Sequence, residues 1–295
     1  TQDRATGVFG KLGQAPAMIP VRLNLENSRG QKDSLNFEVA RDDFLTPLLL
    51  NISIYNALTS QERSIGDSTV SVTGQIRVAG ESPIVLDRRF SGGQSSLQAA
   101  GSVALPVNML LRNSFGKLEI KGIDLEIRTA DGSKSASLER LVVDRSQARA
   151  GETIEITAFA RTNFGRVVSQ KIPVQLPAEL LPGQISISIG DGSSVQRNEA
   201  IQHFVANDLS ELIATLNKTK ISDRLYMKIT RSSNGAIIGS SELPNLPPSV
   251  LATINNDRIS GGSKAATVTV VSETPIAPSA FVISGEQTLT LNVIK

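Results

Sequence analysis

Cysteine and tryptophan are absent from the 295-residue chain, histidine occurs once, and aromatic residues make up only 4% of the sequence. Without cysteine the chain has no disulfide, no thiolate nucleophile and no cysteine-based zinc site. His203 is the only histidine that could serve a serine hydrolase as general base, and no Gly-x-Ser-x-Gly segment accompanies it. The most common covalent chemistries therefore have no support in the sequence.

An excess of one charge is also missing, because 30 lysines and arginines are balanced by 28 acidic residues. The basic residues are scattered, with Arg88-Arg89 as the one obvious doublet, which gives no basic patch for nucleic acid or anionic lipid. The most apolar stretch, residues 44–58, falls short of the about 18 apolar residues that span a bilayer. It is interrupted by Thr46, Pro47, Asn51 and Asn56. We predict neither a nucleic-acid partner nor a transmembrane segment.

Period-two alternation of apolar residues, the pattern of half-buried strands, is abundant. It recurs along the whole chain, for example in Val21-Leu23-Leu25, Ile154-Ile156-Ala158 and Ile185-Ile187-Ile189. Turns rich in glycine, asparagine and aspartate separate these runs, and Asn234-Gly235 is the strongest hairpin signal. The pattern predicts a mainly β protein.

About three short helices interrupt the predicted strands. They are expected near residues 47–59, 208–218 and 248–255. Thr46 as N-cap and Pro47 at the first helical position begin the first helix. Its apolar stripe consists of Leu48, Ile52 and Tyr55. Asp208 and Glu211 form a capping box at the start of the second helix. We expect all three helices to cover sheets, with their apolar sides buried.

A polar run at residues 131–137 separates two strand-rich halves and predicts a domain boundary there. We predict a β-rich, sandwich- or barrel-like domain over residues 1–135 with the first helix, and a second over 136–295 with the other two. Residues 138–192 follow the strand–turn rhythm of an immunoglobulin-like sandwich without its Cys-Trp-Cys core. The second domain is therefore predicted to be partly immunoglobulin-like.

Three short patterns look like chemical motifs but lack the residues that would complete them. Ser114-Phe115-Gly116-Lys117 has the Ser-x-x-Lys spacing without its companion motifs, and Gly7, Gly10 and Gly13 are not followed by Gly-Lys-Ser/Thr. Asp42-Asp43 and Asp191 offer too few carboxylates for a calcium ion, which favours turn and N-cap roles. We predict no catalytic residue, no cofactor and no metal site, and hence no enzyme.

The amino-terminal part carries Gln2-Asp3-Arg4, the three spaced glycines, Met18-Ile19-Pro20-Val21 and Leu45-Thr46-Pro47. Together with Leu225-Tyr226 and Leu246-Pro247-Pro248-Ser249-Val250, these segments resemble the region that follows the catalytic core in exported bacterial proteins with a SpoIVB-type serine peptidase domain. The nucleophile segment of that family, of the Gly-x-Ser-Gly-Ser-Pro type, does not occur here. The resemblance implies a β-rich, non-catalytic region of an exported protein.

The leading hypothesis is a non-catalytic, exported structural or assembly protein that self-associates or docks through β-strand edges, such as an extracellular filament or surface-layer subunit. Its expected partner is itself or another exported protein, outside the cell, on its surface or in the periplasm. The last alternating segment supplies the candidate assembly strand, with Leu289, Leu291 and Val293. The alternative is an accessory C-terminal region that positions or anchors a SpoIVB-type peptidase domain.

Overall fold

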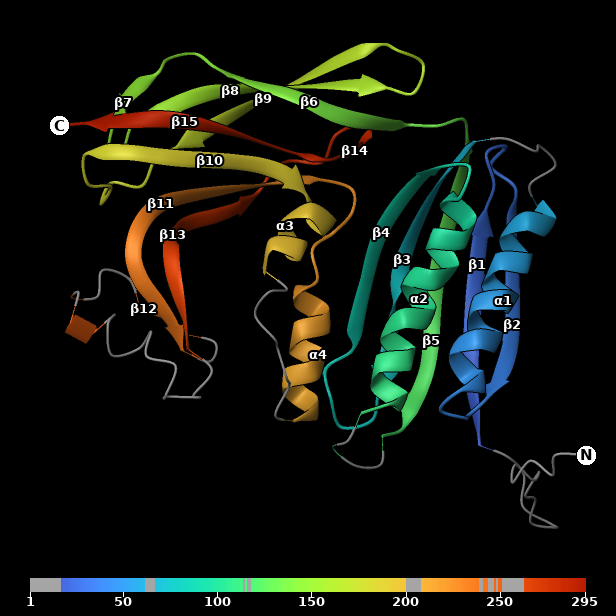
Figure 1. Cartoon of the computed structure of the whole chain (residues 1–295). Helices are drawn as coiled ribbons and strands as arrows, with labels where there is room; N and C mark the ends of the chain where they lie inside the picture. The colour runs from blue at the N-terminus through green and yellow to red at the C-terminus, as the bar shows by residue number, and fades with distance from the viewer. Residues whose placement is uncertain are drawn as a thin grey trace, which may run out of the picture.

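The structure is a computed structural model that describes residues 17–61, 67–113, 115, 118–199, 208–238, 241–243, 247, 249–250 and 263–295. Over these residues the protein is mainly β, as predicted, with several multi-stranded sheets and four helices. Figure 1 shows two units: a five-stranded sheet lined by helices, and a stack of strands that lies across its upper end.

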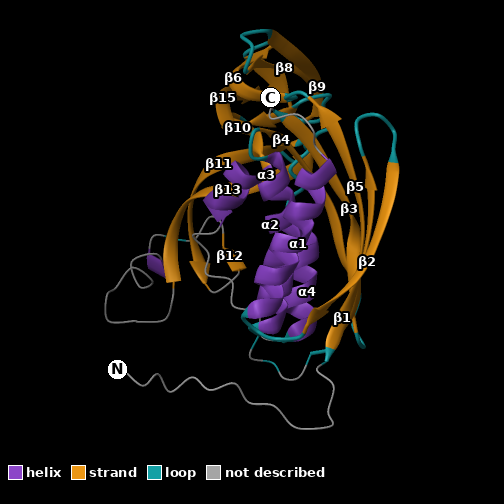
Figure 2. Ribbon diagram, turned by 90° about the vertical axis from the view of Figure 1, so that its right-hand side faces the viewer, coloured by secondary structure: helices purple, strands orange, loops and turns teal. Residues whose placement is uncertain are grey.

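The first unit is an α/β layer. It comprises β1 (Met18–Glu26), β2 (Lys32–Ala40), α1 (Leu45–Gln61), β3 (Ser68–Val78), β4 (Ile84–Gly92), α2 (Ser95–Leu111) and β5 (Ile120–Asp131). The strand order is β2-β1-β5-β3-β4, and only the β1–β5 pair is parallel. Figure 2 shows the helices on one side of this sheet and the other side bare. One face of the sheet is therefore a core face and the other is an outer face.

The burial of β1 shows how the sequence produces this arrangement. Ile19, Val21, Leu23 and Leu25 are buried, and the residues between them face the uncovered side. The core beneath the helices combines these side chains with apolar residues of the other strands and with Leu50 and Val107 from α1 and α2. The period-two pattern therefore predicted both the strand and its buried face correctly.

The second unit is built from two sheets. Its strands are β6 (Ser135–Val143), β7 (Gln147–Arg149), β8 (Thr153–Thr162), β9 (Val167–Gln175), β10 (Gly183–Asp191), β11 (Leu225–Ile238), β12 (Ser241–Leu243), β13 (Ser263–Pro275), β14 (Val282–Ser284) and β15 (Glu286–Ile294). One sheet has the order β12-β11-β10-β15-β7, with β13 paired to β11, and the other has β14-β6-β8-β9. Apolar side chains from both sheets form a single core. That residues 1–135 and 136–295 fold as independent domains stays a prediction.

Two helices follow β10. They are α3 (Gly192–Glu199) and α4 (Leu209–Lys218). Asp208 caps α4 by accepting a hydrogen bond from the N–H of Glu211 at 2.7 Å, which confirms the predicted helix start. In sequence α4 lies between strands of the second unit, but its buried side chains belong to the core of the first unit. They are Leu212, Ile213 and Leu216. The helix thus ties the two units together.

The first predicted helix exists, but its cap and its buried face differ from the prediction. The Asp42 carboxylate accepts hydrogen bonds from the N–H groups of Phe44 and Leu45, so Asp42 caps α1 in place of Thr46. Thr46 lies in the first turn, and its hydroxyl bonds the backbone of Asp42 and Ala40. The stripe of Leu48, Ile52 and Tyr55 is exposed. Because α1 is apolar on every side, another set of residues could fill the core: Leu50, Ile54 and Leu58.

Two further features of the local structure differ from what the sequence predicted. Asn234-Gly235 forms no hairpin turn, because both residues lie within β11, whose pairing with β13 shifts register between Ser232 and Gly235. Helix α2 was not expected from the sequence at all. Of the helix expected at 248–255, only residues 249–250 are described, and both are helical.

Candidate functional site

The two edges of the five-stranded sheet differ in how their backbone groups are satisfied. At β4, the Asn217 side chain accepts a hydrogen bond from the N–H of Val85 at 2.9 Å and donates one to the carbonyl of Pro83 at 3.1 Å. Farther along, the Ser222 hydroxyl accepts from the N–H of Arg89 at 3.0 Å and donates to its carbonyl at 2.9 Å. These side chains imitate a neighbouring strand, so the β4 edge is sealed.

The β2 edge is less completely covered: the Asp33 carboxylate accepts a hydrogen bond from the outward N–H of Ser34 at 2.9 Å, and the Thr46 hydroxyl donates to the Ala40 carbonyl at 2.6 Å. The pairing of β2 with β1 continues just beyond both ends of the strands. There the N–H of Arg41 donates to the Ala17 carbonyl, and the N–H of Asn27 donates to the Gln31 carbonyl. Hydrogen-bonded pairs alternate along an antiparallel ladder, so the odd-numbered residues of β2 bond to β1. The even-numbered residues direct their N–H and C=O groups away from the sheet. They are Lys32, Ser34, Asn36, Glu38 and Ala40. Apart from the Ser34 N–H and the Ala40 carbonyl, this row has no partner within the described residues, so its centre at Asn36 and Glu38 is available to an added strand.

The open face of the same sheet carries a polar groove of about 670 Å³. Within it, Arg77 Nε lies 2.9 Å from the Asp124 carboxylate, and Arg22 Nε lies 3.9 Å from the same carboxylate. The Arg77 guanidinium fits there because Gly122 has no side chain; a Cβ on Gly122 would come within 2.6 Å of Arg77 Nη2. Positive and negative groups are thus already paired with each other. The groove suits a broad polar contact better than a small ion.

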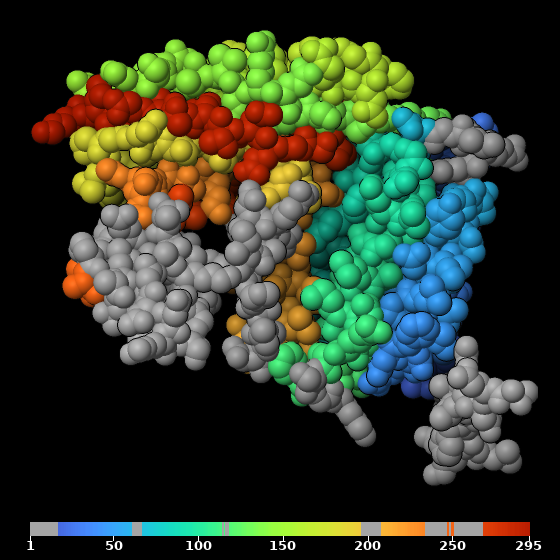
Figure 3. Space-filling view, viewed as in Figure 1, coloured from blue at the N-terminus to red at the C-terminus, as the bar shows by residue number. Residues whose placement is uncertain are grey.

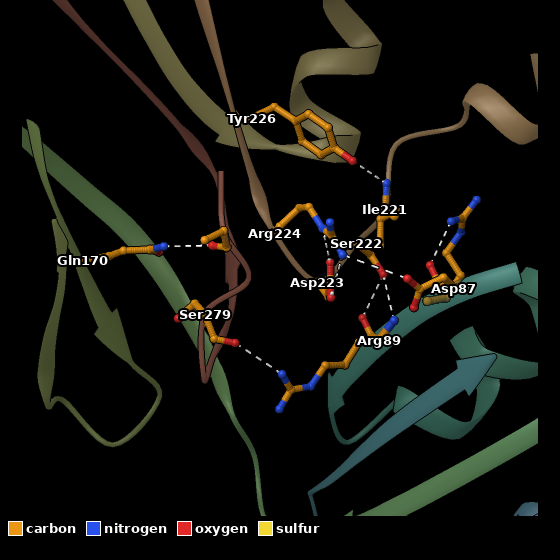
Figure 4. Close-up of polar contacts among 11 residues, drawn as sticks. Asp87, Arg89, Gln170, Ile221, Ser222, Asp223, Arg224, Tyr226 and Ser279 are labelled. Carbon is orange, nitrogen blue, oxygen red and sulfur yellow. Dashed lines mark hydrogen bonds and ion pairs between the residues drawn. The ribbon is translucent and has the colours of Figure 1, made fainter. Parts of the chain in front are cut away.

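A polar junction connects the sealed edge to the sandwich (Figure 4). The Arg89 guanidinium donates to the carbonyls of Ser279 and Ala280, each at 3.3 Å, and Tyr226 accepts from the N–H of Ile221 at 2.7 Å. Burial lowers the pKa of the neighbouring Arg88 guanidinium, against the opposing influence of nearby carboxylates. All of these hydrogen bonds join one part of the chain to another. The junction therefore holds the two units together and leaves the β2 edge as the outward end of the sheet.

The candidate assembly strand is β15, and the structure places it inside a sheet. It pairs with β10 from Glu286 to Val293 and with β7 from Asn292 to Ile294. Leu291 and Val293 are buried in the sandwich core, and Leu289 packs against it. Exchange of this strand with a neighbour would first have to break these pairs. An assembly role for Leu289, Leu291 and Val293 stays a prediction, whereas β2 already has an unpaired edge.

Some of the other residues that the sequence singled out lie in the described part of the chain. Backbone N–H groups of Leu45 and Phe44 hold the pKa of the Asp42 carboxyl below its usual value, consistent with a capping role. Asp191 also precedes a helix and accepts hydrogen bonds from Ser193 and Ser194. No cluster of metal-ligating side chains occurs in the described part of the chain. His203, the Ser114–Lys117 pattern apart from Phe115, and the three spaced glycines lie outside the described residues.

No protein-family description, curated protein or solved structure matches the chain. The resemblance to the region downstream of a SpoIVB-type peptidase domain, and the immunoglobulin-like character of the second unit, therefore stay predictions. No helix within the described ranges is long and apolar enough to cross a membrane. Function has to be inferred from the surfaces themselves.

Sequence reasoning did not single out the residues that distinguish the two edges. Asn217 and Ser222 lie more than a hundred positions from the strand that they seal. Neither residue belongs to a sequence motif that indicates a strand edge. Only the three-dimensional order of the strands shows which of them are edges.

Proposed function

We propose that this protein is a non-catalytic docking module that binds an extended segment of a partner by strand addition to β2. The observation that carries the proposal is the contrast between the two edges of one sheet: side chains from outside the strand seal β4, while the outward backbone groups of Asn36 and Glu38 in β2 have no partner among the described residues. Strand addition uses such groups for affinity and the alternate side chains for specificity.

The neighbours of the β2 edge define the kind of segment that would fit. On the helix-covered side β2 offers Leu35, which is 37% exposed, and the partly buried Phe37. On the open side it offers the polar side chains of Ser34, Asn36 and Glu38. An added strand would therefore alternate apolar and polar residues. The charged residues near the two ends of β2 are typical protection against unspecific pairing and leave its centre free.

The β9 edge of the four-stranded sheet is less suited to this role. β9 carries Pro173, which has no N–H to donate, and Lys171, a typical edge-protecting residue. The segment around Ala277 also lies beside β9, where its carbonyl accepts a hydrogen bond from Gln170 at 2.9 Å. A partner could pair along β2 without displacing any described segment. Export and a place in a filament or surface layer, like the accessory role beside a peptidase domain, stay predictions.

The proposal is tested with the variant Asn36→Pro. Proline removes one outward N–H from the β2 edge and none of the bonds to β1, so it blocks an added strand at little cost to the sheet. We expect that random ten-residue peptides selected on the wild-type protein alternate apolar and polar residues. Their affinity, measured by fluorescence anisotropy, should fall at least tenfold on Asn36→Pro.

The matched control is Asp43→Pro, three residues beyond β2 and directly after the capping residue Asp42, where proline is well tolerated. It should leave peptide affinity unchanged. Hydrogen exchange of residues 32–40 should slow when peptide is bound. Enriched peptides that bind both proline variants equally well, or a selection that enriches no peptide, would count against docking at β2.

A further inference from the structure

Helices α1 and α2 carry no charged residue from Leu45 to Gln61 or from Ser95 to Leu111. A helix on the surface of a globular protein usually has a charged or polar outer face. Figures 1 and 3 show the two helices side by side at the front of the first unit. They approach closely where Gly101 of α2 meets α1, since a Cβ there would lie 3.7 Å from the Asn51 side-chain nitrogen. Together they form one continuous, uncharged layer.

The outer side of this layer is apolar. Ile52 in α1 is 46% exposed and Leu105 in α2 is 59% exposed. Seven further large apolar side chains next to them are also exposed, and the nine together are called the helix patch: Phe44, Leu45, Leu48, Leu49, Ile52, Tyr55, Leu97, Leu105 and Met109. The inner sides of the same helices are already filled, with Leu50, Ile54 and Val103 fully buried. The nine exposed residues thus do not contribute to the core of the first unit.

The size of the helix patch matches an interface. With about 200 Å² for a fully exposed large residue, the nine fractional exposures correspond to roughly 900 Å² per chain. A stable protein–protein interface buries about 800 Å² on each partner, whereas contiguous apolar patches on monomers rarely exceed a few hundred Å². The patch is therefore large enough to hold a dimer together.

We propose that the helix patch is the interface between two copies of this chain, related by a two-fold axis that passes close to Ile52 and Leu105. A two-fold interface brings the same surface of both copies together, so any uncompensated charge would meet its own copy. The complete absence of charge on α1 and α2 fits that arrangement. Enrichment in methionine and aromatic residues, here Met109, Phe44 and Tyr55, is typical of such interfaces.

Lipid is the less suitable occupant. Helices that lie on membranes carry lysine and arginine on their polar side, and neither α1 nor α2 has a basic residue. A partner of another sequence would find no charge on these helices by which to be steered or selected. The second copy therefore remains as the occupant that this surface fits best, and it would leave β2 free on each chain.

Sedimentation equilibrium of the full chain tests this inference. We expect a species of twice the 31.4 kDa chain mass at micromolar concentration. Ile52→Lys and Leu105→Lys should each raise the dimer dissociation constant by roughly a hundredfold, because each buries two unpaired charges at the interface centre. The matched control is Phe164→Lys, an 80% exposed apolar residue at the β8–β9 turn, and it should leave the constant unchanged.

A cysteine-free chain also allows a direct geometric check. Ile52→Cys should form an interchain disulfide under mild oxidation, and Phe164→Cys should not. A monomer at 100 µM would overturn the inference, as would a dimer that both lysine variants leave intact. Flotation of the wild-type chain with lipid vesicles, lost in Ile52→Lys, would assign the patch to a membrane instead. Peptide binding at β2 should survive in the lysine variants, which separates the failure of either proposal from the other.

Discussion

The Gly74→Ala variant is expected to lose about 4 kcal/mol of its free energy of unfolding. Gly74 lies in β3 opposite Leu125 of β5, with φ at 155°. A Cβ at this position would lie 2.2 Å from the carbonyl oxygen of Asp124 and 3.0 Å from the Cα of Leu125. Both contacts are with backbone, which cannot rotate away as a side chain can. The added methyl group must therefore push β3 from β5 in the centre of the sheet.

Urea unfolding followed by circular dichroism measures this loss, with Gly80→Ala as the control. Gly80 also has a positive φ, 76°, but no atom lies within 4 Å of its virtual Cβ. Its replacement should cost about 1 kcal/mol from backbone strain alone. The difference between the two variants isolates the steric contact between β3 and β5. Equal destabilisation by both would show that β3 and β5 are farther apart at Gly74 than the contact of 2.2 Å with the Asp124 carbonyl requires.

The strands of this protein could be predicted from sequence because most of them bury only one face. In β8 and β10, as in β1, the buried residues recur at every second position, which is the pattern that the sequence displays. The cap of α4 was also predictable, because Asp208 and Glu211 are local in sequence and act locally in the structure. Signals of this kind need no knowledge of the rest of the fold.

Helix α2 gave no comparable signal. Gln94 precedes it without a side-chain cap, Pro106 lies within it, and Gly101 occupies the contact with α1. Each of these residues disfavours a helix locally, and packing against the sheet overrides them. In α1 the opposite problem arose: apolar residues on all sides made the buried face ambiguous, so Leu48, Ile52 and Tyr55 were assigned to the core. The misassigned stripe is exposed and forms part of the helix patch.

The sequence predicted docking through the edge of a strand, but it did not predict which strand. Docking through a strand edge was expected, but the edge depends on the strand order, in which β5 enters between β1 and β3 and leaves β2 and β4 outside. The last strand, β15, looked suitable because its apolar and polar residues alternate strongly. Inside the sheet between β10 and β7, the same alternation reflects burial of Leu291 and Val293 against the sandwich core.

Asp191→Ala is expected to lower the free energy of unfolding by about 3 kcal/mol at pH 7, because it removes the acceptor of a nearly enclosed hydrogen-bond network. Asp191 is only 8% exposed. Its carboxylate accepts from the N–H and hydroxyl groups of Ser193 and Ser194 at the start of α3, and from the N–H of Gly285 at 2.7 Å. One side chain thus joins the end of β10 to α3 and to the β14–β15 turn. Thermal or urea unfolding measures the loss.

The pH dependence distinguishes the charge of Asp191 from its size. Burial alone raises the pKa of this carboxyl, but the hydrogen bonds from Ser193, Ser194 and Gly285 outweigh burial and hold the pKa below its ordinary value. A carboxyl with a lowered pKa in the folded state stabilises the protein above the pKa of the unfolded chain, about 3.9. That contribution is lost as the pH falls from about 4 through the folded-state pKa.

The matched variant is therefore Asp191→Asn, which keeps the shape but turns an amide N–H toward the N–H of Gly285. We expect it to be about 2 kcal/mol less stable than the wild type at pH 7. This gap should shrink between pH 4 and pH 2.5, as the wild-type carboxyl takes up a proton and loses its advantage over the amide. A gap that stays constant down to pH 2.5 would mean that the ionised form of Asp191 contributes nothing to the stability of this joint.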